Sequence, residues 1–207
     1  MRIVILAIVA FAGGLLAARA LLMPSRVELP QTERATVLPA PMTLPALELI
    51  GQDGRPLGAD FFKGHWTIVF FGFTSCPDIC PTTLATLSQA TRQLADLPDQ
   101  ERPRVLLVTV DPERDDPSHL AAYLRFYDPA FLGATGTPDA IAAAAAAFRV
   151  PYVKVSLPEG GYTMDHGSGI FVVGPSGGVV AYSSAPHDAT IIAHDYRKLL
   201  AFEGASS

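Results

Sequence analysis

One segment of the chain predicts a strand, a loop and a helix in direct succession. Residues 66–71 are all β-branched or aromatic, which is typical of a strand buried within a sheet. Downstream, Leu84, Leu87 and Leu94 recur at helical spacing, and Pro81 suits the first position of a helix. Because a strand that leads into a helix is the basic unit of layered α/β folds, we expect an α/β domain around this segment.

The two cysteines of the chain, Cys76 and Cys80, both lie in this segment. Cys76 falls on the predicted loop and Cys80 at or near the helix N-terminus, where free N–H groups and the helix dipole favour thiolate over thiol. Four-residue spacing can bring the two sulfurs close enough to share one metal ion or to form one disulfide. A single cysteine is usually inert and buried, whereas a pair on this turn indicates metal or thiol chemistry.

The remaining pattern predicts one domain with a mixed central sheet flanked by helices and preceded by a β-hairpin. In open sheets of this kind, reactive groups gather where strand ends meet helix N-termini, which is where both cysteines fall. The predicted hairpin turn covers residues 51–54, the later strands cover 104–110, 131–136, 150–157, 169–173 and 179–182, and the later helices cover 118–126, 137–147 and 188–201.

Among the five histidines, His166 has the context of a candidate ligand. It lies in a predicted loop over residues 163–169, whose glycines let the backbone bend towards a neighbouring loop. Composition alone leaves open whether His166 binds a metal or lies on the surface. The other histidines have no evident partner in the sequence, so we expect solvated positions for His65, His119, His187 and His194.

Three stretches resemble the motifs of the Sco (SenC) family of copper chaperones. Residues 73–82, Phe-Thr-Ser-Cys-Pro-Asp-Ile-Cys-Pro-Thr, resemble the family signature, and residues 110–115, Val-Asp-Pro-Glu-Arg-Asp, resemble the second motif. Residues 162–166, followed by 170–175, resemble the third motif, which carries a histidine ligand. The match runs in the same order over roughly residues 45–200, so it is far more specific than an isolated cysteine pair.

This resemblance implies a thioredoxin-like, peroxiredoxin-related fold. It also implies copper held by Cys76, Cys80 and His166, and a role in assembling the binuclear copper site of cytochrome c oxidase. The implied partners are the copper-bearing subunit II of the oxidase, other periplasmic copper carriers and thiol reductants.

The chemistry of these three donors agrees with copper. Two thiolates and an imidazole suit Cu(I), and they hold Cu(II) when a further weak ligand is added. Zinc accepts the same donors, but a structural zinc site normally has four protein ligands. Asp78 and Asp165 are candidates to orient the ligands through hydrogen bonds, although a helix cap and a turn explain them equally well. We expect the turn over residues 111–116 to cap the next helix and to supply no ligand.

The N-terminus predicts export. Residues 3–23 are apolar except for Arg19, and such a segment is long enough to span a bilayer. The alternative is a cleaved signal peptide, because residues 18–20 have the small-x-small form of a cleavage site. We expect a membrane anchor over 1–23, a proline-rich linker over 24–45 and a copper-binding domain over 46–207, located on the periplasmic side of a bacterial-type inner membrane.

Charge and motif spacing weigh against other classes of function. The net charge is −5 and no cluster of Lys or Arg is present, which excludes an electrostatic footprint for nucleic acid.

A thiol–disulfide oxidoreductase that keeps the recipient's cysteines reduced is the alternative function. Against it, thioredoxin-like oxidoreductases usually have two residues between their cysteines and a cis-proline opposite them, but here the spacing is three and residues 163–169 contain no proline. A peroxiredoxin would need Thr-x-x-Cys, whereas Thr74 stands two residues before Cys76.

Overall fold

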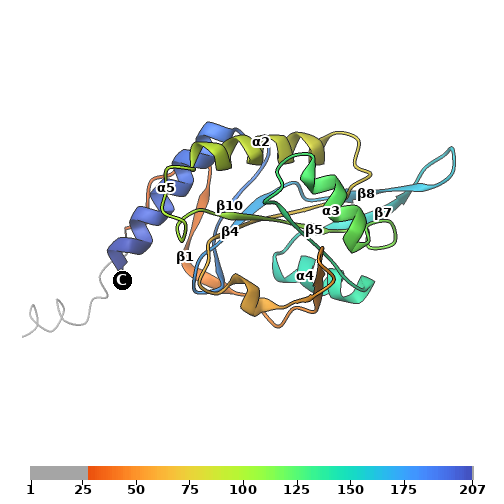
Figure 1. Ribbon diagram of the computed structural model, residues 1–207, viewed down its shortest axis with the longest axis horizontal. Helices are drawn as coiled ribbons and strands as arrows, with labels where there is room; N and C mark the ends of the chain where they lie inside the picture. The colour runs from red at the N-terminus through yellow and green to blue at the C-terminus, as the bar shows by residue number, and fades with distance from the viewer. Residues whose placement is uncertain (1–27, 207) are drawn as a thin grey trace, which may run out of the picture.

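The structure is a computed structural model that describes residues 28–206. Its centre is a mixed sheet with the strand order β1-β10-β9-β4-β5-β6-β2-β3 (Figure 1). A separate two-stranded sheet pairs β7 with β8. The strands are β1 (Thr36–Thr43), β2 (Leu49–Gly51), β3 (Pro56–Leu57), β4 (Thr67–Gly72), β5 (Arg104–Thr109), β6 (Leu132–Thr135), β7 (Tyr152–Ser156), β8 (Tyr162–His166), β9 (Ile170–Val173) and β10 (Gly178–Ser183).

Helices cover both faces of the large sheet (Figure 1). They are the short 3-10 helix η1 (Ala59–Phe62) and the α-helices α2 (Ile79–Gln93), α3 (Pro117–Arg125), α4 (Pro138–Ala147) and α5 (Ala189–Ser206). Helix α2 packs beside α5, and α4 lies on the opposite side of the sheet. The predicted mixed sheet, its flanking helices and the β2–β3 hairpin are therefore confirmed.

Strand β4 is the middle of the sheet, as the run of β-branched and aromatic residues predicts. All of its residues are buried, and it pairs in parallel with β5 and antiparallel with β9. The strand leads through residues 73–78 into α2, which begins at Ile79, two residues before the predicted start. Pro81 is therefore the third helical residue, a position it tolerates because N–H groups of the first turn have no partner within the helix.

Part of the predicted linker belongs to the sheet, and the domain boundary at residue 46 is wrong for this reason. Strand β1 lies inside residues 24–45 and pairs antiparallel with β10, with an irregularity between Val37 and Met42. Pro39 and Pro41 occupy this irregular stretch, and proline is tolerated in a sheet at an edge strand or a bulge. Because of its prolines, this edge strand has the sequence pattern of a linker.

The predicted anchor over residues 1–23 lies outside the described residues. Within residues 28–206, no helix has both the length and the apolar character needed to cross a bilayer.

A buried carboxylate fixes the chain just before β1. Asp195 of α5 is 4% exposed and accepts hydrogen bonds from the backbone N–H groups of Glu33, Arg34 and Ala35 at 2.7–2.9 Å. Burial opposes the ionisation of Asp195, but these N–H donors outweigh it and hold the pKa of the carboxyl below its ordinary value. The chain is thus bound to the domain from Glu33 onwards.

Replacing Asp195 with alanine should destabilise the domain by about 2 kcal/mol, because three backbone donors lose a charged acceptor. Since the folded pKa is lowered, this stabilisation is present above the ordinary Asp pKa and disappears as the pH falls through the folded value. Urea unfolding at neutral pH should show the full difference between wild type and Asp195→Ala, and the difference should shrink below about pH 3.9. His194→Ala, which removes the ring's contacts with Glu33 and Asp195 but leaves the three backbone donors in place, should cost less than about 1 kcal/mol; equal losses for the two variants would contradict this account.

Candidate metal centre

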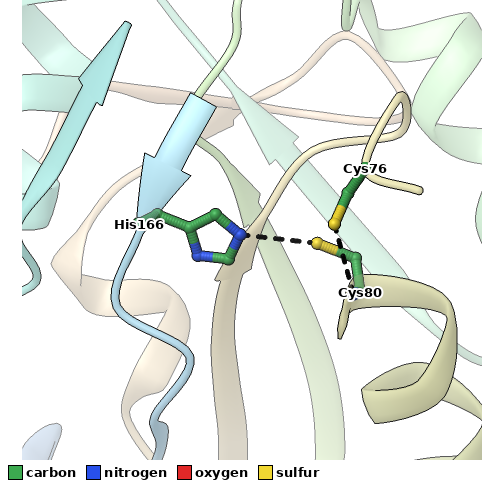
Figure 2. A group of neighbouring side chains, drawn as sticks. All are labelled: Cys76, Cys80 and His166. Atoms are coloured by element: carbon green, nitrogen blue, oxygen red, sulfur yellow. Dashed lines mark hydrogen bonds between the residues drawn. The ribbon is translucent and has the colours of Figure 1, made fainter. Parts of the chain in front are cut away.

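Cys76, Cys80 and His166 converge at the C-terminal end of β4 (Figure 2). Their ligand atoms all lie within 4.8 Å of one another, and Cys80 Sγ is 3.5 Å from His166 Nε2. Both cysteines are free thiols and buried. Cys76 Sγ accepts a hydrogen bond from the backbone N–H of Cys80 at 3.4 Å. The arrangement could hold one metal ion through two sulfurs and one nitrogen.

Gly72 makes room for the Cys80 sulfur. A Cβ atom at this position would lie 2.9 Å from Cys80 Sγ and 2.9 Å from a ring carbon of Phe70. Those contacts are too short for any side chain, so the last residue of β4 has to be glycine for the Cys80 side chain to pack in its observed place.

The His166 ring presents Nε2 to the sulfurs. Its Nδ1 lies 3.0 Å from the carbonyl oxygen of Gly167, so Nδ1–H donates there and Nε2 carries the free lone pair. The rings of Phe70 and Phe73 meet the imidazole edge to face, with centroids 6.2 and 5.8 Å away. Burial lowers the pKa of His166 and outweighs the opposing effect of the Gly167 carbonyl, which keeps the ring neutral and able to bind a metal at neutral pH.

His166 is the last residue of β8, whereas the sequence predicted a loop over residues 163–169. Strand β8 pairs with β7, and Tyr152 lies opposite His166. The strand is short and half exposed, so its sequence lacks the apolar alternation of an ordinary strand. Beside the imidazole is a cavity of about 300 Å³, lined by Pro151, Tyr152 and Asp165 among others. His166 is therefore reachable from outside while the sulfurs are covered.

The protonation state of Cys80 differs from the sequence-based expectation. The helix N-terminus predicted a stabilised thiolate, but burial raises the pKa of the Cys80 thiol and outweighs an opposing hydrogen bond with the Phe73 backbone. Without a metal, Cys80 is therefore protonated at neutral pH. Metal binding has to displace this proton, so ion uptake should release protons.

Asp115 holds the cysteine loop in place. It is completely buried and accepts hydrogen bonds from the Thr74 backbone N–H at 3.0 Å, from the Thr74 hydroxyl, and from the Thr109 hydroxyl at 2.6 Å. Thr74 lies two residues before Cys76, and Thr109 ends β5. The carboxylate thus joins the cysteine loop to the strand beside β4.

Asp111 holds the histidine strand from the same turn. Its carboxylate accepts a hydrogen bond from the Tyr162 hydroxyl at 2.8 Å and pairs with Arg114. Arg114 also donates to the Tyr162 carbonyl at 3.2 Å and lies over the Tyr162 ring. Because Tyr162 begins β8 and His166 ends it, residues 111–115 position both halves of the site without supplying a ligand. The predicted helix cap is also present, since the side chain of Asp116 accepts from the His119 N–H.

Asp78 and Asp165, the residues predicted to orient the ligands, show no orienting hydrogen bond in the described part of the chain. Asp78 is the N-cap residue of α2 and its side chain makes no capping hydrogen bond. Asp165 is exposed and favours the protonated form of His166 through its charge alone. Within residues 28–206, neither carboxylate hydrogen-bonds to Cys76, Cys80 or His166. Asp111 and Asp115 do the orienting instead.

Two of the remaining histidines differ from the expected solvated positions. His65 and His119 are exposed. His187 is half-buried, and its Nε2 lies 2.8 Å from the Ser168 carbonyl oxygen. His194 is also half-buried and lies 3.3 Å from carboxylate oxygens of Glu33 and Asp195.

The fold and the site together define a thioredoxin-like protein with a Cys-x-x-x-Cys and His metal centre. The structure is similar to Arabidopsis thaliana ScoI with copper bound, with a TM-score of 0.71 and 29% identity over 76% of this chain and 98% of that one. The human protein named "Protein SCO2 homolog, mitochondrial" is 34% identical over 193 residues, which is 92% of this chain and 73% of the relative. The mouse protein of the same name is 36% identical over 154 residues, 74% of this chain and 60% of the relative.

The family model described as SCO1/SenC matches residues 38–201. The chain therefore belongs to the SCO1/SenC family, and the resemblance drawn from the three motifs is confirmed. The match begins inside β1, in agreement with a domain that starts before residue 46.

Asp115→Asn should weaken metal binding about 10- to 100-fold, the usual effect of losing a group that orients ligands. The asparagine amide has the same shape as the carboxylate. However, one of the three groups that donate hydrogen bonds to Asp115 loses its acceptor. Competition titration with a chelator would measure the affinity, and the Cu(II) absorption spectrum would report the altered position of the sulfurs. Asp78→Asn is the matched control, because Asp78 lies closer in sequence to the cysteines but makes no side-chain cap; an effect of Asp78→Asn as large as that of Asp115→Asn would refute the assignment.

Proposed function

We propose that this protein is a copper chaperone that binds one copper ion through Cys76, Cys80 and His166 and helps to assemble the binuclear copper site of cytochrome c oxidase. The observation that carries the proposal is the convergence of these three ligand atoms within 4.8 Å. Its support is the chemistry of the set, because two sulfurs and an imidazole suit Cu(I) and hold Cu(II) with an additional weak ligand. Arabidopsis thaliana ScoI, a solved relative, has copper bound.

The geometry also suits release of the ion. Three donors leave a coordination position for a ligand from the recipient, and the cavity beside His166 gives such a ligand a path to the imidazole. A ligand-exchange route of this kind needs no enzyme chemistry, since the ion moves between donor sets of similar softness.

Thiol–disulfide exchange is the second candidate function, favoured by the closeness of the two free sulfurs. In this role the protein would reduce the copper-binding cysteines of the recipient, forming its own Cys76–Cys80 disulfide. Cys80 is fully buried whereas Cys76 is 8% exposed, so Cys76 is the more accessible attacking thiol. Metal analysis after reconstitution with Cu(I), Cu(II) and zinc separates the two functions: a chaperone retains one copper per chain against competing zinc, and a reductase does not.

Alanine at any of the three ligand positions should weaken copper binding by more than about 100-fold, beyond the effect of losing an orienting group. The fold should persist, because the site lies at the ends of elements that the core holds in place. Chelator competition gives the affinity and thermal unfolding tests the fold.

His65→Ala is the matched control for His166→Ala, since His65 is exposed and away from the site. Unchanged copper affinity in His166→Ala would show that the three-ligand site is wrong.

We further propose that residues 3–23 anchor the domain to the outer face of a bacterial-type inner membrane, near subunit II of the oxidase. The support is the apolar sequence of this segment and the hold of Asp195 on the chain from Glu33 onwards. Only residues 24–32 then separate the two, and nine residues reach at most about 32 Å when fully extended. Such a short tether would confine the domain to the membrane surface and raise its effective concentration near a membrane-bound recipient.

Replacing residues 1–23 with a cleavable export signal should leave copper binding unchanged and reduce oxidase assembly in cells. Copper affinity of the purified protein and copper content of the oxidase are the two measurements. A mature native chain that begins at Leu21 and is released in the soluble fraction would rule out the anchor.

A further inference from the structure

A second cavity lies next to the histidine loop and is lined by none of the three ligand residues. Its volume is about 360 Å³, the size of a small-ligand or side-chain pocket. Most of its lining is apolar. Phe148, Phe171 and Tyr182 form an aromatic wall, with ring centroids 5.4 Å apart for the first pair and 6.5 Å for the second. Tyr182 is 40% exposed, so this wall opens to solvent.

Arg149 gives this apolar cavity a single positive charge. It is the one charged residue among those that line the cavity. The Arg149 residue is exposed, and its guanidinium has no hydrogen bond or ion pair within residues 28–206. The protein as a whole carries a net charge of −5. Arginine and aromatic side chains are both enriched at the centres of protein interfaces.

The backbone of Arg149 adopts a conformation that is unfavourable for arginine. Its φ is 57°, which makes it the one non-glycine residue in the left-handed region among the described residues. Arg149 follows the last turn of α4, where its N–H donates to the Ala146 carbonyl and the Val150 N–H donates to the Ala145 carbonyl. Glycine or asparagine is favoured at this position of a helix C-terminus. Arginine adopts this conformation less readily than glycine or asparagine. Its presence here points to a function for the side chain.

The cavity shares its wall with the metal centre. Gly167 and Gly169 both line it, and the carbonyl oxygen of Gly167 is the acceptor that orients His166. A molecule in the cavity would therefore touch the backbone that sets the direction of the imidazole.

We propose that this cavity binds a segment of a partner protein in which an apolar or aromatic side chain stands next to an aspartate or glutamate. The apolar side chain packs on Phe171 and Tyr182, and the carboxylate pairs with Arg149. The N-terminal segment of this chain does not fit, because residues 1–27 contain no acidic residue. The inference rests on the proposed function in one respect, because it identifies the partner as the protein that exchanges copper with the metal centre.

Isothermal titration of the metal-free, reduced full chain in detergent tests the cavity independently of copper. The probe is the blocked peptide acetyl-Gly-Asp-Phe-Leu-Gly-amide, with two comparison peptides in which Asp is replaced by Asn or Phe-Leu by Ala-Ala. We expect the Asp peptide to bind at least about tenfold more tightly than either comparison peptide, since each lacks one of the two recognised groups. In Arg149→Asn, the Asp and Asn peptides should bind equally weakly.

Asparagine adopts the left-handed conformation readily, so Arg149→Asn should unfold at the same temperature as wild type or higher, and lost binding cannot be assigned to misfolding. Arg125→Asn, at an exposed arginine that does not line the cavity, should bind the Asp peptide normally. No binding at about 1 mM peptide, equal binding of the Asp and Asn peptides by wild type, or undiminished binding by Arg149→Asn would each overturn the proposal. So would self-association of the full chain that Arg149→Asn abolishes, because the occupant would then be a second copy.

Discussion

The buried carboxylate of Asp115 is the interaction on which the metal centre depends most directly. It gathers hydrogen bonds from Thr74 and from Thr109, and so joins the loop after β4 to the end of β5. Without it, the cysteine loop would keep its covalent connections but lose its fixed position over the sheet. A buried carboxylate surrounded by donors is costly to disturb, because every donor then loses its partner away from water. The position of Cys76 is therefore held from a neighbouring strand.

The same short turn also determines where the histidine lies. Asp111 binds Tyr162 four residues before His166, while Arg114 contacts the backbone and the ring of the same tyrosine. One loop of the domain thus aligns two ligand groups that come from distant parts of the chain. A shift of this turn would move both groups together, which preserves their spacing better than two independent supports would.

The sequence predicted those parts of the structure that local patterns determine. The β4 strand, the following helix and the position of Cys80 follow from residues near one another in the chain. Strand β1 was missed because its partner, β10, lies far along the chain and because Pro39 and Pro41 weaken its pattern. The raised pKa of Cys80 was missed because burial depends on tertiary packing. The approach of His166 to the cysteines was predicted only through the family resemblance, and the role of Asp115 had no local signal distinct from a helix cap.

The ligands come from two separate sheets. Cys76 and Cys80 follow β4 of the large sheet, and His166 ends β8 of the two-stranded one. A single ion bound to all three would close a loop of 86 residues between Cys80 and His166 through coordination bonds, much as a disulfide would, but reversibly. Closing such a loop restricts the unfolded chain more than the folded one. Copper loading should therefore make the domain harder to unfold, and unloading should restore a less stable protein.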